Sequence, residues 1–396
     1  MRMAKSQHGF TLLELMIASF IGVLVVLAIS SLFKAGMDVT FAITQRAETQ
    51  ANMRAAVELM TRDISQAGAG LPSGGLQLVS GGTKSKYACD KNGICYVVNH
   101  TYPNNAAGGA NYMYGIIPGP NNGVQNGAVI PNAAGVPDAS ITTISCDYSF
   151  PLTNFVYTFG AANGSAVGVT LNVIDPNAPT DIQPATGGGL NSGDLILFTV
   201  VGAGAAANGN TPVQKAVAVG EITGGTNPTM ASGIAFAAGD QLNFNQTTGN
   251  SDLSQVVSAA GPVGTPIPQT TLTSCRLNVV TYFLQVPAAG GTVQTPRLMR
   301  QVNGLPPVPV ADNIINLQIT YDLIDSLTGY LSSNLADPIG AGQSPSLIQK
   351  VNIWIMGESL TPRGNKSQSM YLATSVAARD MSFCNSYSNT AVACGN

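Results

Sequence analysis

A run of apolar residues near the N-terminus constrains this chain more than any other feature. It begins at Phe10, and residues 15–33 include no charged side chain. As a helix, residues 10–33 would be roughly 36 Å long, enough to cross the apolar core of a bilayer, which is about 30 Å thick. Arg2 and Lys5 precede the run, whereas the charges just after it cancel. We therefore expect a membrane-spanning helix with a cytoplasmic N-terminus and the remaining chain on the opposite side.

Beyond residue 33 the pattern changes to that of an amphipathic helix. Apolar side chains recur at spacings of three and four, opposite a charged face, up to a segment rich in glycine. These apolar positions are Met53, Val57, Met60, Ile64 and Ala67. Because no proline interrupts residues 10–70, we expect one helix over 10–67. Its second part, 34–68, would be a stalk that packs on this chain's own sheet, whereas the first part needs lipid or other subunits to cover it.

The composition argues against several functional classes. Only 9% of the residues are charged, compared with about 25% in a typical soluble domain. The net charge of -3 provides no basic surface for nucleic acid, so no nucleic-acid binding is expected. His8 and His100 are the only histidines, and no nucleophile-elbow, zincin or P-loop motif occurs. We expect a protein that is not an enzyme and has no cofactor or metal; a membrane-anchored enzyme is the outside alternative.

All six cysteines follow the apolar run. They are Cys89, Cys95, Cys146, Cys275, Cys384 and Cys394. An even number beyond a membrane segment indicates disulfides in an oxidising compartment, although free buried thiols are an alternative. Spacings of C-x5-C and C-x9-C do not fit zinc sites. We expect the pairs 89–95 and 384–394, with 146–275 remaining by elimination.

The start of the apolar run resembles a known signal. Gly9-Phe10-Thr11-Leu12-Leu13-Glu14, followed by the run, is similar to the class III signal of type IV prepilins and type II secretion pseudopilins. The resemblance implies that prepilin peptidase removes the leader 1–9 between Gly9 and Phe10 and methylates the new amine of Phe10. Gly9 has no side chain, so its backbone can lie close to the protease. The hydrophobic helix would then stay on the mature chain.

The charge of Glu14 has two interpretations. A carboxylate in a membrane segment costs about 2.5–3.5 kcal/mol on insertion scales and usually has a partner. Near the N-terminus of a helix, the helix dipole and the lipid headgroups would make the charge tolerable. The pilin resemblance implies a more specific role, in which Glu14 pairs with the N-terminal ammonium of Phe10 on a neighbouring subunit. We favour the second interpretation because tolerance does not explain the placement.

Residues 69–396 predict a β-rich head with antiparallel sheet. Asn-Gly between Cys89 and Cys95 is typical of a hairpin. Residues 101–274 are poor in charge and predict a loop-rich β insertion. Strands are expected at 141–145, 155–159, 194–201, 217–222, 277–286, 297–301, 313–323, 351–357 and 370–378. The fold class is α+β: a long N-terminal helix, its first half in the membrane, packed on this head.

Several segments outside the insertion resemble the PilW family of minor pilins. They are Met60–Gly68, Thr281-Tyr-Phe-Leu, Leu298-Met-Arg-Gln-Val-Asn-Gly, residues 312–322, Val351-Asn-Ile-Trp-Ile-Met-Gly-Glu-Ser and Ala377-Ala-Arg-Asp. The resemblance covers roughly residues 1–80 and 276–383. Members of that family often end in Arg-Asn where this chain has Arg379 and Asp380. The transmembrane half also lacks the proline that is common in major pilins.

The resemblance implies a minor pilin that primes assembly of a type IV pilus or lies at its tip, with a possible part in surface adhesion or motility. Its partners would be other major and minor pilins, prepilin peptidase and the inner-membrane assembly platform. Before assembly it would be a single-pass inner-membrane protein with a periplasmic head, and afterwards part of the pilus or cell surface. A J-type minor pseudopilin of type II secretion is the main alternative, and an adhesive major subunit is another.

Overall fold

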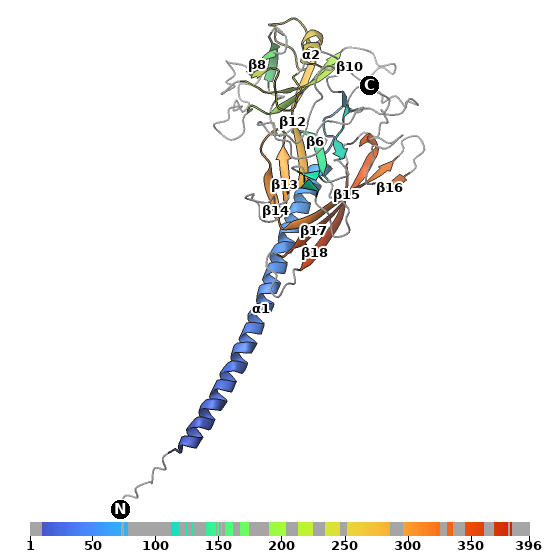
Figure 1. Cartoon of the computed structure of the whole chain (residues 1–396). Coiled ribbons are helices and arrows are strands. Elements are labelled where there is room, and N and C mark those ends of the chain that lie inside the picture. The colour runs from blue at the N-terminus through green and yellow to red at the C-terminus, as the bar shows by residue number, and fades with distance from the viewer. Residues whose placement is uncertain are drawn as a thin grey trace, which may run out of the picture.

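The protein consists of one long helix that carries a β-rich head at its C-terminal end (Figure 1). The computed structural model describes residues 10–72, 75–77, 112–118, 124–125, 128–129, 140–147, 149, 152, 155–160, 167–173, 190–202, 213–224, 234–245, 252–285, 296–324, 331–335, 345–359, 368–378 and 381. The α+β fold class expected from the sequence is confirmed.

Helix α1 spans Leu12–Ser65, close to the expected 10–67. Its 54 residues give a length of about 81 Å, and the helix bends gently along its course (Figure 1). The chain turns away from the helix through Gly68, which has φ 89°. Glycine adopts this left-handed conformation without steric cost, so it suits the end of a helix. The Gly68 N–H then donates to the Ile144 carbonyl at 2.8 Å, which attaches the end of the helix to the head.

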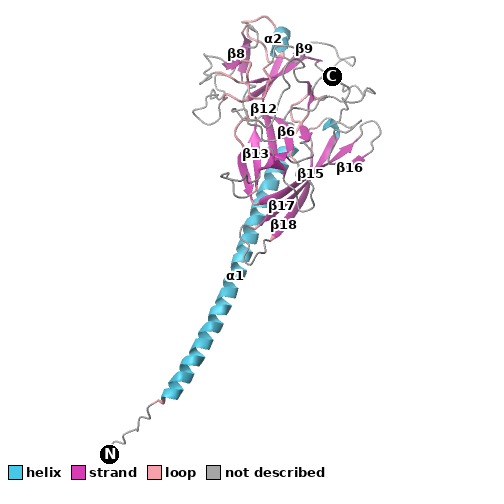
Figure 2. Cartoon of the chain, viewed as in Figure 1, coloured by secondary structure: helices cyan, strands magenta, loops and turns pink. Residues whose placement is uncertain are grey.

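The head contains five antiparallel sheets, counted over the described residues (Figure 2). A seven-stranded sheet has the order β10-β9-β12-β13-β14, with β6 paired to β12 and β3 to β6. Its strands are β3 (Ile116–Pro118), β6 (Ile141–Asp147), β9 (Leu195–Gly202), β10 (Val213–Glu221), β12 (Leu272–Gln285), β13 (Arg297–Val302) and β14 (Val308–Asp312). A four-stranded sheet has the order β16-β15-β17-β18. Its strands are β15 (Ile314–Ile324), β16 (Leu331–Leu335), β17 (Ile348–Glu358) and β18 (Ser369–Ala377), with the short helix η3 (Pro345–Leu347) before β17.

Three smaller sheets complete the set. The three-stranded sheet has the order β11-β8-β7, and two pairs of strands stand apart as β1-β2 and β4-β5. These strands are β7 (Phe155–Phe159), β8 (Val167–Val173), β11 (Ile234–Phe236), β1 (Leu76–Gln77), β2 (Tyr112–Met113), β4 (Val124–Gln125) and β5 (Ala128–Val129). Helix α2 (Leu253–Ala260) lies at the far end of the head (Figure 2).

The second half of α1 is buried against the head. Its apolar stripe packs with β12, β13, β15 and β17 in one core. The helix contributes Met53, Ala56, Val57, Met60, Ile64 and nearby Ala67. The approach is close at Gly357 on β17, where an added Cβ would lie 2.9 Å from Cγ2 of Thr49 and 3.1 Å from Sδ of Met53. The expectation that this stripe packs on the chain's own sheet agrees with the burial of these side chains.

The far part of the head, here called the distal lobe, has a core of its own. Every buried member of that core lies between Leu152 and Leu272, and the aromatic side chains dominate it. Phe198 makes edge-to-face contacts with Tyr157, Phe159 and Phe236 at centroid distances of 5.7–5.8 Å. In the sequence the lobe lies between β6 and β12, which are neighbouring strands of the seven-stranded sheet. Its strands β9 and β10 extend that same sheet, because β9 pairs with β12.

The expected strands differ from the observed ones mainly at their ends. Each of the nine overlaps an observed strand, but β12 begins at Leu272, five residues before the expected start. The short strands β1 to β5, the strands β8, β11, β14 and β16, and helix α2 were not expected from the pattern. Strand β14 includes Pro309, which weakens a strand assignment, and in the structure it forms the edge of its sheet, where proline is tolerated. The expected hairpin between Cys89 and Cys95 lies outside the described residues.

A cluster of charged and aromatic groups joins α1 to the seven-stranded sheet. Arg300 donates from Nε to Oδ2 of Asp63 at 2.8 Å, and the Tyr282 hydroxyl donates to the same oxygen at 2.6 Å. The Asp63 and Arg300 side chains are only 12% and 24% exposed. The ion pair thus fixes the rotation of the helix relative to β12 and β13.

Replacing Arg300 tests how far this cluster stabilises the helix on its sheet. Arg300→Met should lower the free energy of unfolding by about 1–3 kcal/mol, because it leaves the mostly buried Asp63 carboxylate without its cation. The control is Arg297→Met, whose partner Asp312 is 54% exposed and whose loss should cost less than about 1 kcal/mol. Urea titrations of both variants measure the difference, and equal losses would contradict this assignment.

Candidate assembly site on the N-terminal helix

The first turn of α1 is closed by a capping box between Thr11 and Glu14. The Glu14 N–H donates to Oγ1 of Thr11 at 3.3 Å. In return, the backbone N–H and the hydroxyl of Thr11 both donate to Oε2 of Glu14 at 3.0 Å. Two N–H groups that would otherwise lack partners at the helix start are thereby satisfied. The carboxylate has a structural role within its own chain.

Thr11 was missed as a functional residue by the sequence reasoning. The signal was present, because Thr11-Leu-Leu-Glu14 has the Thr-x-x-Glu spacing of a capping box. Both bonds from Thr11 end on Oε2, so Oε1 of the exposed Glu14 has no bonded partner among the described residues.

Phe10 lies beside this cap with its side chain 89% exposed. Glu14 follows it by four residues, so one turn of helix separates the two positions. Gly9 lies outside the described residues. The structure therefore brings Phe10, Thr11 and Glu14 together at one end of the helix, while processing at Gly9 stays a prediction.

The first half of α1 exposes almost only apolar side chains. It is the one helix among the described residues that is long and apolar enough to cross a membrane, with a mean hydropathy of 2.7 and no part of the apolar window buried. Its hydroxyls are satisfied locally: Ser19 and Ser31 donate to the carbonyls of Met16 and Ala28 at 2.9 and 2.8 Å. The surface thus presents few unsatisfied polar groups, which suits lipid or another apolar helix.

The apolar surface continues past the charges of Lys34 and Asp38. Met37, Phe41 and Ile43 are 55%, 47% and 62% exposed, and the first buried residue of the helix is Thr49. One face here is a shallow depression. It is lined by Ile29, Leu32, Phe33, Gly36, Met37, Thr40, Phe41 and Thr44. A depression on a single helix cannot enclose a ligand, but its smallest residue, Gly36, would let a second helix approach closely.

Two of the six cysteines lie among the described residues. Cys146 on β6 and Cys275 on β12 form a disulfide with a Cα–Cα distance of 5.6 Å, the pair that elimination had left. Both of these cysteines are buried. The expected partners Cys89, Cys95, Cys384 and Cys394 lie outside the described residues, so their pairing stays a prediction.

A second cluster of titratable groups lies in the head, away from α1. The buried carboxyls of Glu221 and Asp240 share a hydrogen bond, and each also accepts from backbone N–H groups of residues 241–245. Burial raises the pKa of Glu221 to about 8, and the neighbouring Asp240 carboxylate adds to this rise. Asn245 completes the cluster, accepting from Glu221 N at 2.9 Å. A hydrogen bond between two carboxyls needs a proton on one of them, and the other contacts of these oxygens are N–H donors, so the cluster does not resemble a cation site.

This carboxyl pair should make stability depend on pH. A carboxyl with a raised folded-state pKa contributes stability that is fully present below its unfolded pKa and is lost as pH rises through the folded value. The free energy of unfolding should therefore fall between about pH 5 and pH 8. Glu221→Gln should remove most of this slope, because an amide does not titrate. Asp240→Asn should reduce it only partly, since burial, the larger cause, still acts on Glu221. Urea titrations from pH 5 to 9 measure this, and an unchanged slope in Glu221→Gln would contradict it.

No other chemistry is apparent in the described part of the chain. Among those residues, no group of three His, Cys, Asp or Glu side chains could hold a metal ion. The other buried carboxylates cap a helix or pair with neighbouring groups: Asp252 caps α2, and Asp322 accepts from Asn334 N at 2.9 Å and Asn352 Nδ2 at 3.0 Å.

Comparison with known proteins agrees with the geometry of the first helix. Residues 4–33 match the family described as the prokaryotic N-terminal methylation motif. No match to a curated protein or to a solved structure was found. The matched segment contains Gly9, Phe10, Thr11 and Glu14 together with the apolar run. The motif, a prepilin-type signal, supports a type IV pilin-like or pseudopilin protein that is anchored in a membrane, and it implies a structural role and association with other pilus components.

Proposed function

We propose that this chain is a minor pilin of the PilW type, which joins a type IV pilus through α1 after prepilin peptidase has cut between Gly9 and Phe10. The observation that carries the proposal is the length over which α1 exposes apolar side chains that no other part of the described chain covers. From Leu12 to Ile43 the exposed apolar surface extends over about 48 Å, whereas a bilayer core is about 30 Å thick.

A single protein in a membrane cannot cover that surface by tilting. A helix of about 48 Å would have to tilt by roughly 50° to fit, and observed tilts range over about 0–40°. Lys34 and Asp38 also mark a position where the helix leaves the hydrocarbon. Met37, Phe41 and Ile43 therefore need a protein partner, and the helices of neighbouring pilins have the required shape and chemistry.

The electrostatics of Glu14 support the same proposal. The capping box occupies Oε2, and Oε1 has no bonded partner among the described residues. An ammonium at Phe10 of a neighbouring subunit can bind Oε1 while the cap persists. Each charge then compensates the other in the apolar centre of a filament, where an unpaired charge would cost several kcal/mol. Structural capping and pairing between subunits are thus compatible.

The size of the head favours a position at the tip. Beyond the helix, the chain has more than 300 residues, and those that the structure describes include two further buried cores in addition to the one on α1. Such a head is difficult to repeat at every position of a tight helical lattice.

Immunogold labelling against the head should mark filament ends, and labelling along the whole shaft would contradict tip placement.

A J-type pseudopilin is the alternative. It would have the same helix, and it would be found with secretion subunits rather than pilus subunits.

Photo-crosslinking tests the proposed helix contact. A photoreactive residue at Phe41, in the depression beyond the charges, should crosslink to the N-terminal helix of another pilin in cells that assemble pili. The matched control places the photoreactive residue at Leu13, near the start of the membrane segment, in cells without the assembly platform. There the adducts should be mainly with lipid. Absence of protein adducts at Phe41 in assembling cells would contradict the proposal.

A further inference from the structure

Strand β18 forms one edge of the four-stranded sheet and ends the order β16-β15-β17-β18. Its single neighbour among the described residues is β17. Ser369 to Ala377 pair with Glu358 to Lys350 one by one, without a register shift. The strand contacts α1 and lies at the lower end of the head in Figure 1. The side of β18 that faces away from β17 is therefore a long and regular sheet edge.

Every second residue of β18 turns its backbone groups away from β17. The bonds at the two ends of the pairing show which residues these are. Ala378 N donates to Gln349 O at 3.1 Å, and Ser359 N donates to Gln368 O at 2.9 Å. Bonded positions alternate along an antiparallel strand, so the even-numbered residues face β17 and the odd-numbered ones face outward. The N–H and C=O groups of residues 371, 373, 375 and 377 accordingly have no hydrogen-bond partner within the described part of the chain.

The other outer strands of the two large sheets are each interrupted. Strand β14 contains Pro309 and β3 contains Pro118, and proline has no N–H to offer to an added strand. Strand β10 shifts its register between Gln214 and Ala216. Strand β16 has only five residues and also shifts its register against β15. Prolines, bulges and short strands keep natural sheet edges from pairing with other chains.

Strand β18 has none of these protective features. Residues 369–377 include no proline and no charged side chain, and the strand is nine residues long. An exposed edge of this kind is a template for another extended chain. Because a charge buried beside it would have no partner on β18, the matching segment is itself uncharged.

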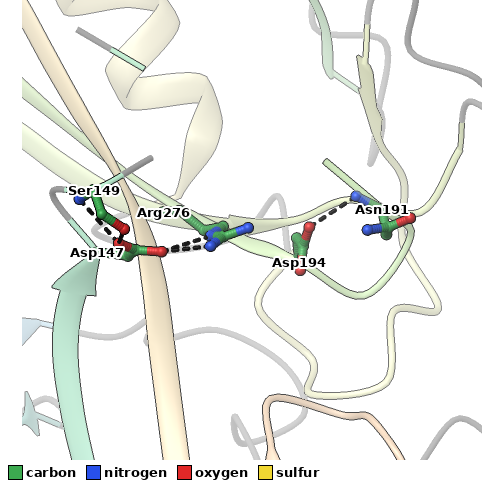
Figure 3. A network of polar contacts seen from close by, with 5 residues as sticks. All are labelled: Asp147, Ser149, Asn191, Asp194 and Arg276. Atoms are coloured by element: carbon green, nitrogen blue, oxygen red, sulfur yellow. Dashed lines mark hydrogen bonds and ion pairs between the residues drawn. The ribbon is translucent and has the colours of Figure 1, made fainter. Parts of the chain in front are cut away.

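The main charged cluster of the head is, by contrast, compensated within the chain. Arg276 on β12 donates from Nε to Oδ2 of Asp147 at 3.2 Å, and Nη2 forms a second bond to the same oxygen (Figure 3). Ser149 N donates to Oδ1 of Asp147 at 3.0 Å. Asp194 lies on the other side of the guanidinium in Figure 3, and its Oδ2 accepts from Asn191 N at 2.7 Å. This cluster therefore offers a partner less than the unpaired backbone of β18 does.

The two faces of β18 indicate which side chains an added strand would carry. On the face toward α1, Met370 and Leu372 are partly buried and pack against the core of the helix. Apolar side chains of an added strand would extend this core. On the opposite face, Tyr371 is 72% exposed and stacks on Trp354 with the ring centroids 6.2 Å apart. A cross-strand aromatic or aliphatic side chain would cover these rings.

The edge is continuous with the surface of α1 that we assign to assembly. Thr49 is the first buried residue of the helix, and a Cβ added at Gly357 on β17 would lie 2.9 Å from its Cγ2. Met370 of β18 pairs with Gly357. The edge thus begins where the exposed part of the helix ends. A subunit whose helix packs beside Phe41 would bring its own head next to β18.

We propose that β18 is a docking edge, to which a neighbouring pilin subunit adds an extended, uncharged strand of its head. The added strand continues the four-stranded sheet: backbone hydrogen bonds provide affinity, and the alternating side chains provide specificity. The inference rests on the proposed function, because filament assembly is what places two heads side by side. It adds a contact between heads to the contact between helices.

A photoreactive residue in place of Tyr371 tests this contact in cells that assemble pili. We expect adducts with the head of another pilin subunit, at a segment that mass spectrometry of the crosslinked peptides identifies. Ala373→Pro in the same chain should lower the adduct yield about tenfold, the effect of losing one or two interstrand hydrogen bonds. The substitution removes an outward N–H and keeps the bonds to β17, a position at which edge strands tolerate proline.

Ser333→Pro is the matched control. Ser333 is exposed on β16, at the opposite edge of the same sheet, so proline there should leave the Tyr371 adducts unchanged. Immunoblots of the membrane fraction check that each variant accumulates. If Ala373→Pro does not, Ala373→Lys takes its place, because lysine on an edge strand hinders pairing without changing the backbone.

Tyr371 adducts that the Ala373 substitution does not reduce would overturn the docking edge. Adducts at Phe41 in cells where Tyr371 gives none would overturn it as well. Both results leave the pilin role standing, because the helix contact is measured separately at Phe41. Absence of protein adducts at both positions would instead remove the pilin role, and the docking edge with it.

Discussion

Filaments sheared from cells that carry Glu14→Gln should contain at least about tenfold less of this protein than wild-type filaments, since each 1.4 kcal/mol of lost assembly energy is a factor of ten. Glutamine at this position can still accept from the Thr11 N–H, as it does in other capping boxes, but it cannot compensate an ammonium on a neighbour. The variant therefore separates capping from charge pairing. Immunoblots of sheared and membrane fractions measure the ratio.

Thr11→Ala is the matched control for this prediction. It removes the hydroxyl of the capping box and leaves the Glu14 carboxylate, at a cost of about 0.5–2 kcal/mol of helix stability. Packing on the head and in a filament holds the helix at many other positions, so assembly should fall much less than with Glu14→Gln. Equal losses in the two variants would show that Glu14 acts only as a cap and would contradict pairing between subunits.

Gly9→Val should leave the chain unprocessed in the membrane. A β-branched side chain beside the scissile bond would keep the peptidase from approaching the backbone between positions 9 and 10. The leader would remain, no free amine would form at Phe10, and the protein should be missing from filaments while its amount in the membrane is unchanged. Intact-mass spectrometry of the membrane fraction measures retention of the leader.

Gly22→Ala serves as the control for Gly9→Val. An added Cβ at Gly22 meets no atom within 4 Å, so the substitution changes a helix glycine without changing the leader. Processing and assembly should both persist. A fully processed Gly9→Val protein in filaments would contradict the assignment of the cleavage site.

Much of the fold follows from short-range patterns in the sequence. In β17, the side chains of Val351, Ile353 and Ile355 alternate with more exposed neighbours, so the period of two identifies both the strand and its buried face. In α1, the spacing of Met53, Met60 and Ile64 identifies the buried stripe in the same way. These elements are predictable because one face of each meets the core and the other does not.

The distal lobe was harder to foresee because its order depends on contacts between distant residues. Strand β10 is built of small and mixed residues, Val213-Gln-Lys-Ala-Val-Ala-Val-Gly-Glu221, and its position is set by pairing with β9. Strand β12 extends to Leu272 because β9 pairs with it there. No local signal indicates such pairing, and none brings Glu221 next to Asp240.

The functional residues show the same difference between features that short sequence patterns encode and features that depend on distant contacts. The apolar run and Glu14 were visible in the sequence, and the methylation motif covers them. The capping bond of Thr11 is also encoded locally, in the Thr-x-x-Glu spacing. By contrast, the ion cluster around Arg276 joins residues from β6, from β12 and from the segment just before β9, and no spacing along the chain could have placed Asp147, Asp194 and Arg276 together.

The most direct test of the account is mass spectrometry of the N-terminal peptide of this protein, recovered from sheared and purified filaments. The account predicts a peptide that begins at Phe10, carries one methyl group on its amine and is present in the filament fraction. Recovery only from the membrane fraction, with residues 1–9 still attached, would contradict the claim that the chain is a processed filament subunit.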